Sequence, residues 1–138
     1  MHTMSSDYIT GVAVLDEQHE QLFRLLQQSE TLLKNENMLY KYEDLQKILK
    51  GLRDYTLSHF ATEEAYMADA AYPQLEAHHQ LHLCFIEKLN QMESAVANIS
   101  LRTQDHILSE LGEYLTQWML QHILEIDKKM IHEIEAAK

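Results

Sequence analysis

Histidines in this chain are numerous, and several are spaced so that they share one face of a helix. The sequence holds 9 histidines in 138 residues. His59 and Glu63 are four residues apart, as are His78 and His82, a spacing that brings two side chains to the same helical face. Imidazole and carboxylate groups are common ligands of protein-bound metal ions. The pattern therefore predicts metal chemistry inside a helical protein.

The candidate ligands occupy positions that the spacing of apolar residues assigns to the core-facing side of each expected helix. Burying a polar group without a partner costs on the order of a few kcal/mol, and a bare carboxylate costs far more. A lone inward histidine is more often a hydrogen-bonded core residue than a ligand, but that explanation weakens when every expected helix contributes. A shared metal centre would supply the common partner. These inward polar residues are His19, His59, Glu63, His78, His82 and His122.

Other residues of the same types are expected outside the site. The remaining histidines are terminal or lie off the inward stripe, which is typical of surface residues: His2, His79, His106 and His132. His79 competes with His78, but the apolar run that contains Leu75 and Leu89 selects His78. Cys84 stands between Leu83 and Phe85 and is interpreted as a small inert packing residue.

Apolar residues at alternating intervals of four and three predict the helices that position these side chains. The 3 glycines and 1 proline leave few places for turns, so connections should be short and neighbouring helices antiparallel. We predict an all-α protein, an up-down-up-down antiparallel four-helix bundle with an N-terminal arm. A single domain over 1–138 would contain the arm at 1–15 and helices near 16–34, 40–68, 73–98 and 101–136.

The apolar phase of the last helix breaks after His122. An unbroken α-helix would turn charged side chains inward there, whereas a slip of one residue places Ile126 and Met130 inward, with Ile134 close by. We therefore predict an inserted residue, as in a π-bulge, between His122 and Met130. The same insertion would return Asp127, five residues after His122, toward the core and make it a seventh candidate ligand.

Seven candidate ligands exceed the needs of one tetrahedral zinc ion, so either two metal ions bind or several candidates are spare. Five imidazoles, two bridging carboxylates and one bridging oxygen would leave one position of two octahedral ions empty. An empty position among apolar side chains suits a small neutral ligand such as dioxygen. Ferritin-like di-iron bundles differ because they use four glutamates and two histidines with a Glu-x-x-His spacing. Fewer anionic ligands favour reversible binding over substrate oxidation.

Composition excludes several other functions. Lys and Arg number 11 against 22 Asp and Glu, a net charge of -11, which is the wrong sign for binding nucleic acid or anionic lipid. No apolar run reaches the roughly 20 residues of a bilayer span, and the first ten residues lack the features of a secretory signal. One cysteine cannot form a disulfide framework, which fits a reducing compartment. We expect a cytoplasmic protein without nucleic-acid or membrane partners.

The combined pattern resembles the hemerythrin family, in particular its single-domain bacterial members, over nearly the whole chain. The segments that carry the similarity are Gly11-Val12, Leu15-Asp16-Glu17-Gln18-His19, His59-Phe60 with Glu63-Glu64, Tyr72-Pro73 with His78 and His82, and Trp118 with His122-Ile123 and Asp127. One departure is Met4, where many bacterial members carry a tryptophan. Tyr8 is the residue expected to cover part of the same surface.

The resemblance implies a non-haem di-iron centre with an oxo or hydroxo bridge and dioxygen as its ligand. One iron ion would be held by three histidines, His78, His82 and His122. The other, under-coordinated iron ion would be held by two histidines, His19 and His59, and would bind dioxygen. Two carboxylates would bridge the ions, Glu63 and Asp127. By the same matching, an apolar oxygen pocket would be lined by Leu22, Phe60, Trp118 and Ile123.

We therefore expect reversible dioxygen binding, in transport, storage or sensing, and not an enzyme. One alternative is an enzyme that reduces peroxide or nitric oxide at the same site, which ranks lower because the sequence offers no evident general acid beyond the ligands. Another is an oxygen-sensing module that reports to a fused or separate signalling output, with the charged segment from Asp127 to Lys138 as the joint. The sequence indicates no particular oligomeric state.

Overall fold

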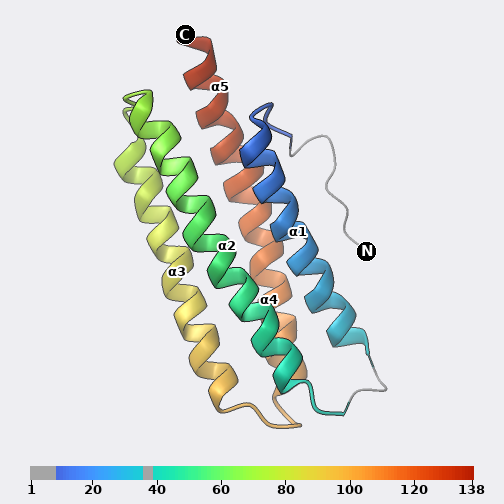
Figure 1. The fold of residues 1–138 in the computed structure, drawn as a ribbon. Helices are drawn as coiled ribbons and strands as arrows, with labels where there is room; N and C mark the ends of the chain where they lie inside the picture. The colour runs from blue at the N-terminus through green and yellow to red at the C-terminus, as the bar shows by residue number, and fades with distance from the viewer. Residues whose placement is uncertain (1–8, 36–38) are drawn as a thin grey trace.

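Four long helical rods run antiparallel along the molecule (Figure 1). A computed structural model describes residues 9–35 and 39–138. Its helices are α1 (Ala13–Lys34), α2 (Tyr42–Asp69), α3 (Leu75–Ala97), α4 (Gln104–Trp118), the π-helical segment η2 (Met119–Asp127) and α5 (Lys128–Ala136). The last three follow one another without a break and form the fourth rod, orange to red in Figure 1. The predicted all-α four-helix bundle is confirmed.

The first rod begins three residues before the expected position, at Ala13. The Asp16 carboxylate accepts hydrogen bonds from the Thr10 backbone N–H at 2.7 Å and the Gly11 backbone N–H at 3.1 Å. Gly11 has a φ of 93°, a conformation that glycine adopts without strain. This turn satisfies donors ahead of the helix, and an acidic residue in the first turn suits the helix dipole. The expected arm residues His2, Met4 and Tyr8 lie outside the described residues.

The lower ends of three rods in Figure 1 are joined through one buried lysine. Lys41, which precedes α2, donates from Nζ to the Leu33 carbonyl at 3.2 Å and to Asp105 at 2.9 Å. Its backbone N–H donates to the Gln104 side-chain oxygen at 2.9 Å, and the Gln104 amide nitrogen donates to the Leu39 carbonyl at 2.6 Å. Because a buried ammonium needs partners, this network fixes how α1, α2 and α4 meet.

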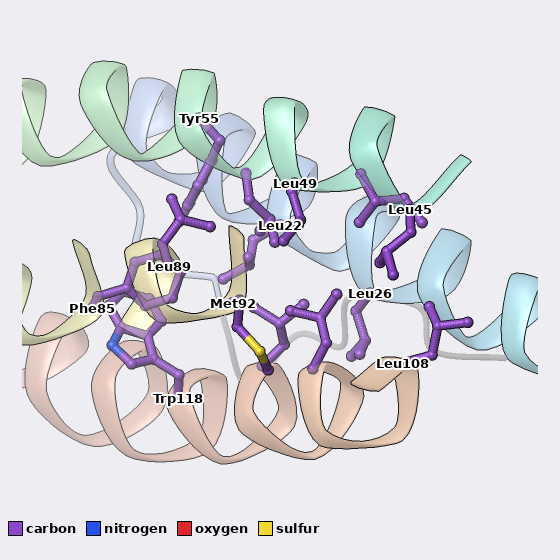
Figure 2. Packing of buried hydrophobic residues seen from close by; sticks show 14 of the residues in the cluster. Leu22, Leu26, Leu45, Leu49, Tyr55, Phe85, Leu89, Met92, Leu108 and Trp118 are labelled. Atoms are coloured by element: carbon purple, nitrogen blue, oxygen red, sulfur yellow. The ribbon is translucent and has the colours of Figure 1, made fainter. Parts of the chain in front are cut away.

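The interior divides into two apolar clusters with polar residues between them. The larger cluster contains Leu22 and Leu26 of α1, Leu45 of α2 and Trp118 of α4 among its members, and Figure 2 shows these side chains converging on one core. The smaller cluster comprises Leu15, Met67, Met130, Ile131 and Ile134. In α1, His19 stands between Leu15 and Leu22, so the polar layer falls where the two clusters meet.

None of the helices within residues 9–35 and 39–138 has the length and apolar character needed to cross a bilayer.

Candidate metal centre

The fourth rod is wound more widely where it passes His122. Segment η2 is π-helical, and the Lys128 backbone N–H that follows it donates five residues back to the Ile123 carbonyl. The predicted insertion is confirmed, although the wide turns begin at Met119 and so upstream of the expected range. His122 Nε2 and Asp127 Oδ1 lie 2.9 Å apart, which a five-residue spacing on a π-helix permits.

One detail of the predicted phase slip is wrong. Ile126 is only half-buried and lines a surface groove with Lys129, whereas Asp127 is fully buried. Met130 and Ile134 are buried as expected. The first inward side chain after His122 is therefore that of Asp127 and not that of Ile126. The Asp127 carboxylate contacts the surrounding imidazoles, and an isoleucine side chain could not.

All seven candidate ligands are buried, with exposed fractions from 0% to 3%, and every rod contributes at least one. They form two clusters that share one glutamate. The first cluster contains Glu63, His78, His82 and His122. The second cluster contains His19, His59, Glu63 and Asp127. Within each cluster the potential ligand atoms lie within 4.8 Å of one another, so each group of four could hold a metal ion.

In the first cluster three imidazole nitrogens surround one carboxylate oxygen. Glu63 Oε1 lies 2.5 Å from His78 Nε2, 3.0 Å from His82 Nε2 and 3.7 Å from His122 Nε2. The His78 and His122 Nε2 atoms are themselves 3.2 Å apart. Three imidazole nitrogens and a carboxylate oxygen can lie this close together only if protons or a metal ion stand between their lone pairs.

In the second cluster several buried atoms have no hydrogen-bond partner. His59 Nε2 and Glu63 Oε2 lie 3.2 Å apart, yet neither makes a hydrogen bond, and the same holds for Asp127 Oδ1. His19 Nε2 lies 3.2 Å from Asp127 Oδ2. Buried polar atoms without partners cost free energy, and lone pairs that face each other are what a cation accepts. The donor set therefore fits a pair of metal ions.

Opposing effects act on the two buried carboxyls. Burial alone would raise the pKa of Glu63, but the close imidazoles of His122, His59, His78 and His82 outweigh it and hold that pKa well below its usual value. Burial and the Glu63 charge would likewise raise the pKa of Asp127, yet His122 and His19 keep it lowered. Both carboxylates are therefore charged, which favours a bound cation.

The histidines themselves fall into two electrostatic classes. Burial lowers the pKa of His59, and the attraction of Glu63 does not compensate for it. For His78, burial also opposes the charged form, but the close carboxylates of Asp127 and Glu63 raise the pKa to about 9. His59 therefore presents a neutral imidazole, the form that binds metals directly, whereas His78 must release a proton first.

Two residues beside the ligands were not predicted from the sequence. The Gln18 side-chain oxygen lies 2.8 Å from His59 Nδ1. Glu64 is half-buried and accepts from His82 Nδ1 at 2.9 Å and from His79 Nδ1 at 2.5 Å. One feature of the sequence could have indicated both residues. A metal-binding imidazole needs a hydrogen-bond partner for its second nitrogen, and polar residues next to the ligands in the sequence are the first candidates.

The four predicted pocket residues are buried, and aromatic rings stack on the ligands. The predicted pocket residues are Leu22, Phe60, Trp118 and Ile123, all in the larger apolar cluster. Phe60 stacks on His82 with ring centroids 3.8 Å apart, and Trp118 stacks on His122 at 4.1 Å. These two rings thus contact the three-histidine cluster, and Phe60 also lies with its ring centroid 5.8 Å from that of His59 in the two-histidine cluster, beside which the resemblance places the pocket.

Tyr55 is a further buried residue at the centre that sequence reasoning missed. Its ring stacks on His59 with centroids 5.1 Å apart, and its hydroxyl has no hydrogen-bond partner. Burial, followed by the charges of Asp127 and Glu63, raises the pKa of Tyr55 well above its ordinary value. Tyrosine at this position looks like ordinary core in the sequence, because its spacing is that of an apolar residue.

The remaining candidates lie away from the centre. His106 and His132 are exposed, as expected. The interpretation of Cys84 as a packing residue is wrong, because its side chain is exposed. Helix α3 turns Phe85 inward instead, and the thiol one residue earlier points outward.

Comparison with known proteins agrees with this arrangement. The family model of the hemerythrin HHE cation binding domain matches residues 10–134. Bacteriohemerythrin of Clostridium acetobutylicum is 30% identical over 131 residues, covering 95% of this chain and 99% of that protein. Bacteriohemerythrin of Pseudomonas paraeruginosa is 30% identical over 88% of this chain and 73% of its own length. Myohemerythrin-1 of Phascolopsis gouldii is 32% identical over 59% of each chain. The chain therefore belongs to the hemerythrin family of cation-binding domains.

Proposed function

We propose that the seven buried ligands hold two iron ions and that the protein binds dioxygen reversibly at this centre. The observation that carries the proposal is the set of unpartnered lone pairs on His59, Glu63 and Asp127, buried in a layer where all four rods meet. Membership of the hemerythrin family supports iron and dioxygen as the occupants. Seven imidazole and carboxylate ligands suit a pair of iron ions better than one four-coordinate structural zinc ion.

The proposed ligand assignment follows the two clusters. One ion would be held by three histidines, His78, His82 and His122. The other would be held by two histidines, His19 and His59. Two carboxylates would bridge the ions, Glu63 and Asp127, with an oxo or hydroxo group completing the bridge. The bound iron pair would supply the electrons with which dioxygen is captured, and the position short of one histidine leaves room for it.

The chain's own contribution to reversibility would be an interior closed to water. Leu22 and Ile123 are fully buried, and Phe60 and Trp118 are nearly so. Their apolar surfaces would exclude water and anions that convert the centre to an inactive oxidised form. The imidazoles of His82 and His122 are also held in orientation by the stacked rings of Phe60 and Trp118.

Metal analysis combined with optical spectroscopy tests this function. The purified chain should contain two iron ions. Reduction without air followed by addition of air should produce a visible charge-transfer band that disappears again when oxygen is removed. Absence of iron, or a band that never reverses, would contradict the proposal. Steady turnover of peroxide or nitric oxide with an electron donor, well above the rate of free iron, would favour the enzyme alternative instead.

We also propose that residues 1–138 form one domain that works in the cytoplasm. Every rod contributes to the same buried centre, which supports a single folding unit. The exposed thiol of Cys84 is stable in a reducing compartment, which supports the location.

A further inference from the structure

Two ligand histidines in different clusters have chemically different partners on their outer nitrogens. His82 Nδ1 donates to a carboxylate oxygen of Glu64 at 2.9 Å. His59 Nδ1 meets the amide oxygen of Gln18 at 2.8 Å. The two contacts have nearly the same length, so the main difference between them is a full negative charge on one partner and none on the other.

The orientation of the Gln18 amide is fixed by a second contact. Its nitrogen donates to Thr62 Oγ1 at 3.3 Å, and the Thr62 hydroxyl already donates to the Ser58 carbonyl at 2.8 Å. Thr62 can therefore only accept from Gln18, which leaves the amide oxygen facing His59. The proton of His59 consequently sits on Nδ1, and its Nε2 lone pair points to the centre.

Glu64 is fixed just as firmly but carries its charge. One carboxylate oxygen accepts from His82 and the other accepts from His79 Nδ1 at 2.5 Å. The Glu64 side chain is 26% exposed, whereas that of His82 is 1% exposed. Water therefore reaches the Glu64 carboxylate and stabilises its charge. The same carboxylate attracts the Nδ1 proton of the buried His82 ring.

A carboxylate partner makes an imidazole a stronger electron donor than an amide partner does, because it draws the Nδ1 proton toward itself. Resting on the metal binding proposed above, we propose that Glu64 and Gln18 are positioning residues that make the two metal positions unequal. Glu64 strengthens His82, so the three-histidine position binds its ion more tightly. Gln18 orients His59 without adding charge, so the two-histidine position holds its ion more weakly.

Exchange of the two partners in the full chain tests this inference. The variants are Glu64→Gln and Gln18→Glu, which keep size and hydrogen bonding nearly constant while moving one charge. Matched controls make the same changes at exposed positions outside the two clusters, Glu87→Gln in α3 and Gln21→Glu in α1. Cobalt(II) alone is titrated into each metal-free protein against a chelator, and thermal unfolding of each metal-free protein confirms that it is folded.

The expected results have opposite signs. Glu64→Gln should weaken the tighter of the two cobalt-binding steps by roughly 10–100-fold, the usual effect of losing such a partner. Gln18→Glu should strengthen the weaker step, and the double exchange should bring the two steps together. A purely structural role would weaken binding in both variants, and that result would overturn the inference.

The wild-type titration separates this inference from the proposed function. Fewer than two cobalt ions per wild-type chain would overturn both. Two ions in the wild type, with Glu64→Gln and Gln18→Glu indistinguishable from their controls, would overturn the unequal positions alone.

Discussion

At the scale of single residues, His78 couples the centre to pH because it lies between both buried carboxylates. Burial would lower its pKa, but Asp127 and Glu63 raise the pKa from 6.5 to about 9. A base whose pKa is higher in the folded state stabilises the fold while it is protonated. This contribution is complete below pH 6.5 and is lost as the pH rises through about 9. The lowered pKa of His59 reduces the free energy of unfolding only below about pH 6.5, because only there is this histidine protonated in the unfolded chain.

We therefore expect the metal-free protein to lose stability between pH 6.5 and 9. Urea unfolding of the chelator-treated chain at several pH values measures this, and the midpoint should fall steadily across the window. The raised pKa of His122 adds to the same trend. The variant His78→Gln should show a flatter profile. A wild-type midpoint that rises across this window would contradict the assigned sign.

The unpartnered hydroxyl of Tyr55 makes a second prediction at this scale. Removing a buried hydroxyl that has no hydrogen bond removes only a desolvation cost, so Tyr55→Phe should leave the free energy of unfolding unchanged or raise it by up to about 1 kcal/mol. Thr56→Val is the matched second case, because the Thr56 hydroxyl is also buried without a partner. Denaturant unfolding of the metal-free variants measures both. A clear loss of stability in Tyr55→Phe would contradict the prediction.

The inward placement of the candidate ligands could be predicted, but their supporting partners could not. His59, Glu63 and His82 share the phase of the apolar residues around them, and that phase follows from helical periodicity alone. Gln18 and Glu64 reach across to a neighbouring rod. Such contacts depend on how two helices are aligned along their axes, and the periodicity of one helix carries no information about that alignment.

At the scale of elements, segment η2 contains one residue more than a regular α-helix would need. Its insertion explains why Met130 and Ile134 face inward although the phase set by His122 would exclude them. The sequence predicted the insertion from this slip. It could not predict where the wide turns begin, because hydrogen bonds to the fifth residue can start at any point upstream that packing tolerates.

Deleting one exposed residue of η2 should therefore preserve the bundle. Without Glu125 the segment can form regular α-helical hydrogen bonds while Met130 keeps its inward direction, so the metal-free variant should be at least as stable as the wild type. Deletion of the exposed Glu113 in α4 is the control, because it turns all later residues by roughly 100° and should prevent folding. Circular dichroism during heating compares them. Loss of folding in the Glu125 deletion would contradict a single insertion.

Helix ends departed from expectation where side chains decide them. The turn made by Asp16 with Thr10 and Gly11 lets α1 begin early, and the network around Lys41 holds the start of α2. Periodicity locates the middle of a helix well, but its ends depend on which donors find partners. Pro73 precedes α3 by two residues, within the turn that includes the positive φ of Ala71.

At the scale of the whole molecule, metal binding and folding should be one equilibrium. A ligand that binds only the folded chain stabilises it by about 2.7 kcal/mol at a free concentration 100 times its Kd. Chelator treatment should therefore lower the Tm of the metal-loaded protein, and re-addition of metal should restore it. Calorimetry with and without chelator measures the shift. An unchanged Tm would contradict a shared equilibrium.

Single-residue variants extend this prediction to the whole fold. His122→Ala should lose metal and with it the stabilisation, since the other ligands would remain buried without their ion. His106→Ala changes an exposed histidine and should keep both metal content and Tm. Retention of two ions by His122→Ala would contradict the proposed ligand set.

The polar layer between the two apolar clusters also restricts how the rods can slide. Volume-conserving exchanges among apolar side chains usually cost less than about 1.5 kcal/mol, so the apolar clusters alone would oppose such a shift only weakly. Moving one rod by a turn would leave Glu63 or Asp127 facing leucines, at the cost of a buried unpaired charge. The carboxylates of Glu63 and Asp127 thus also fix the position of each rod along the bundle axis relative to the other three.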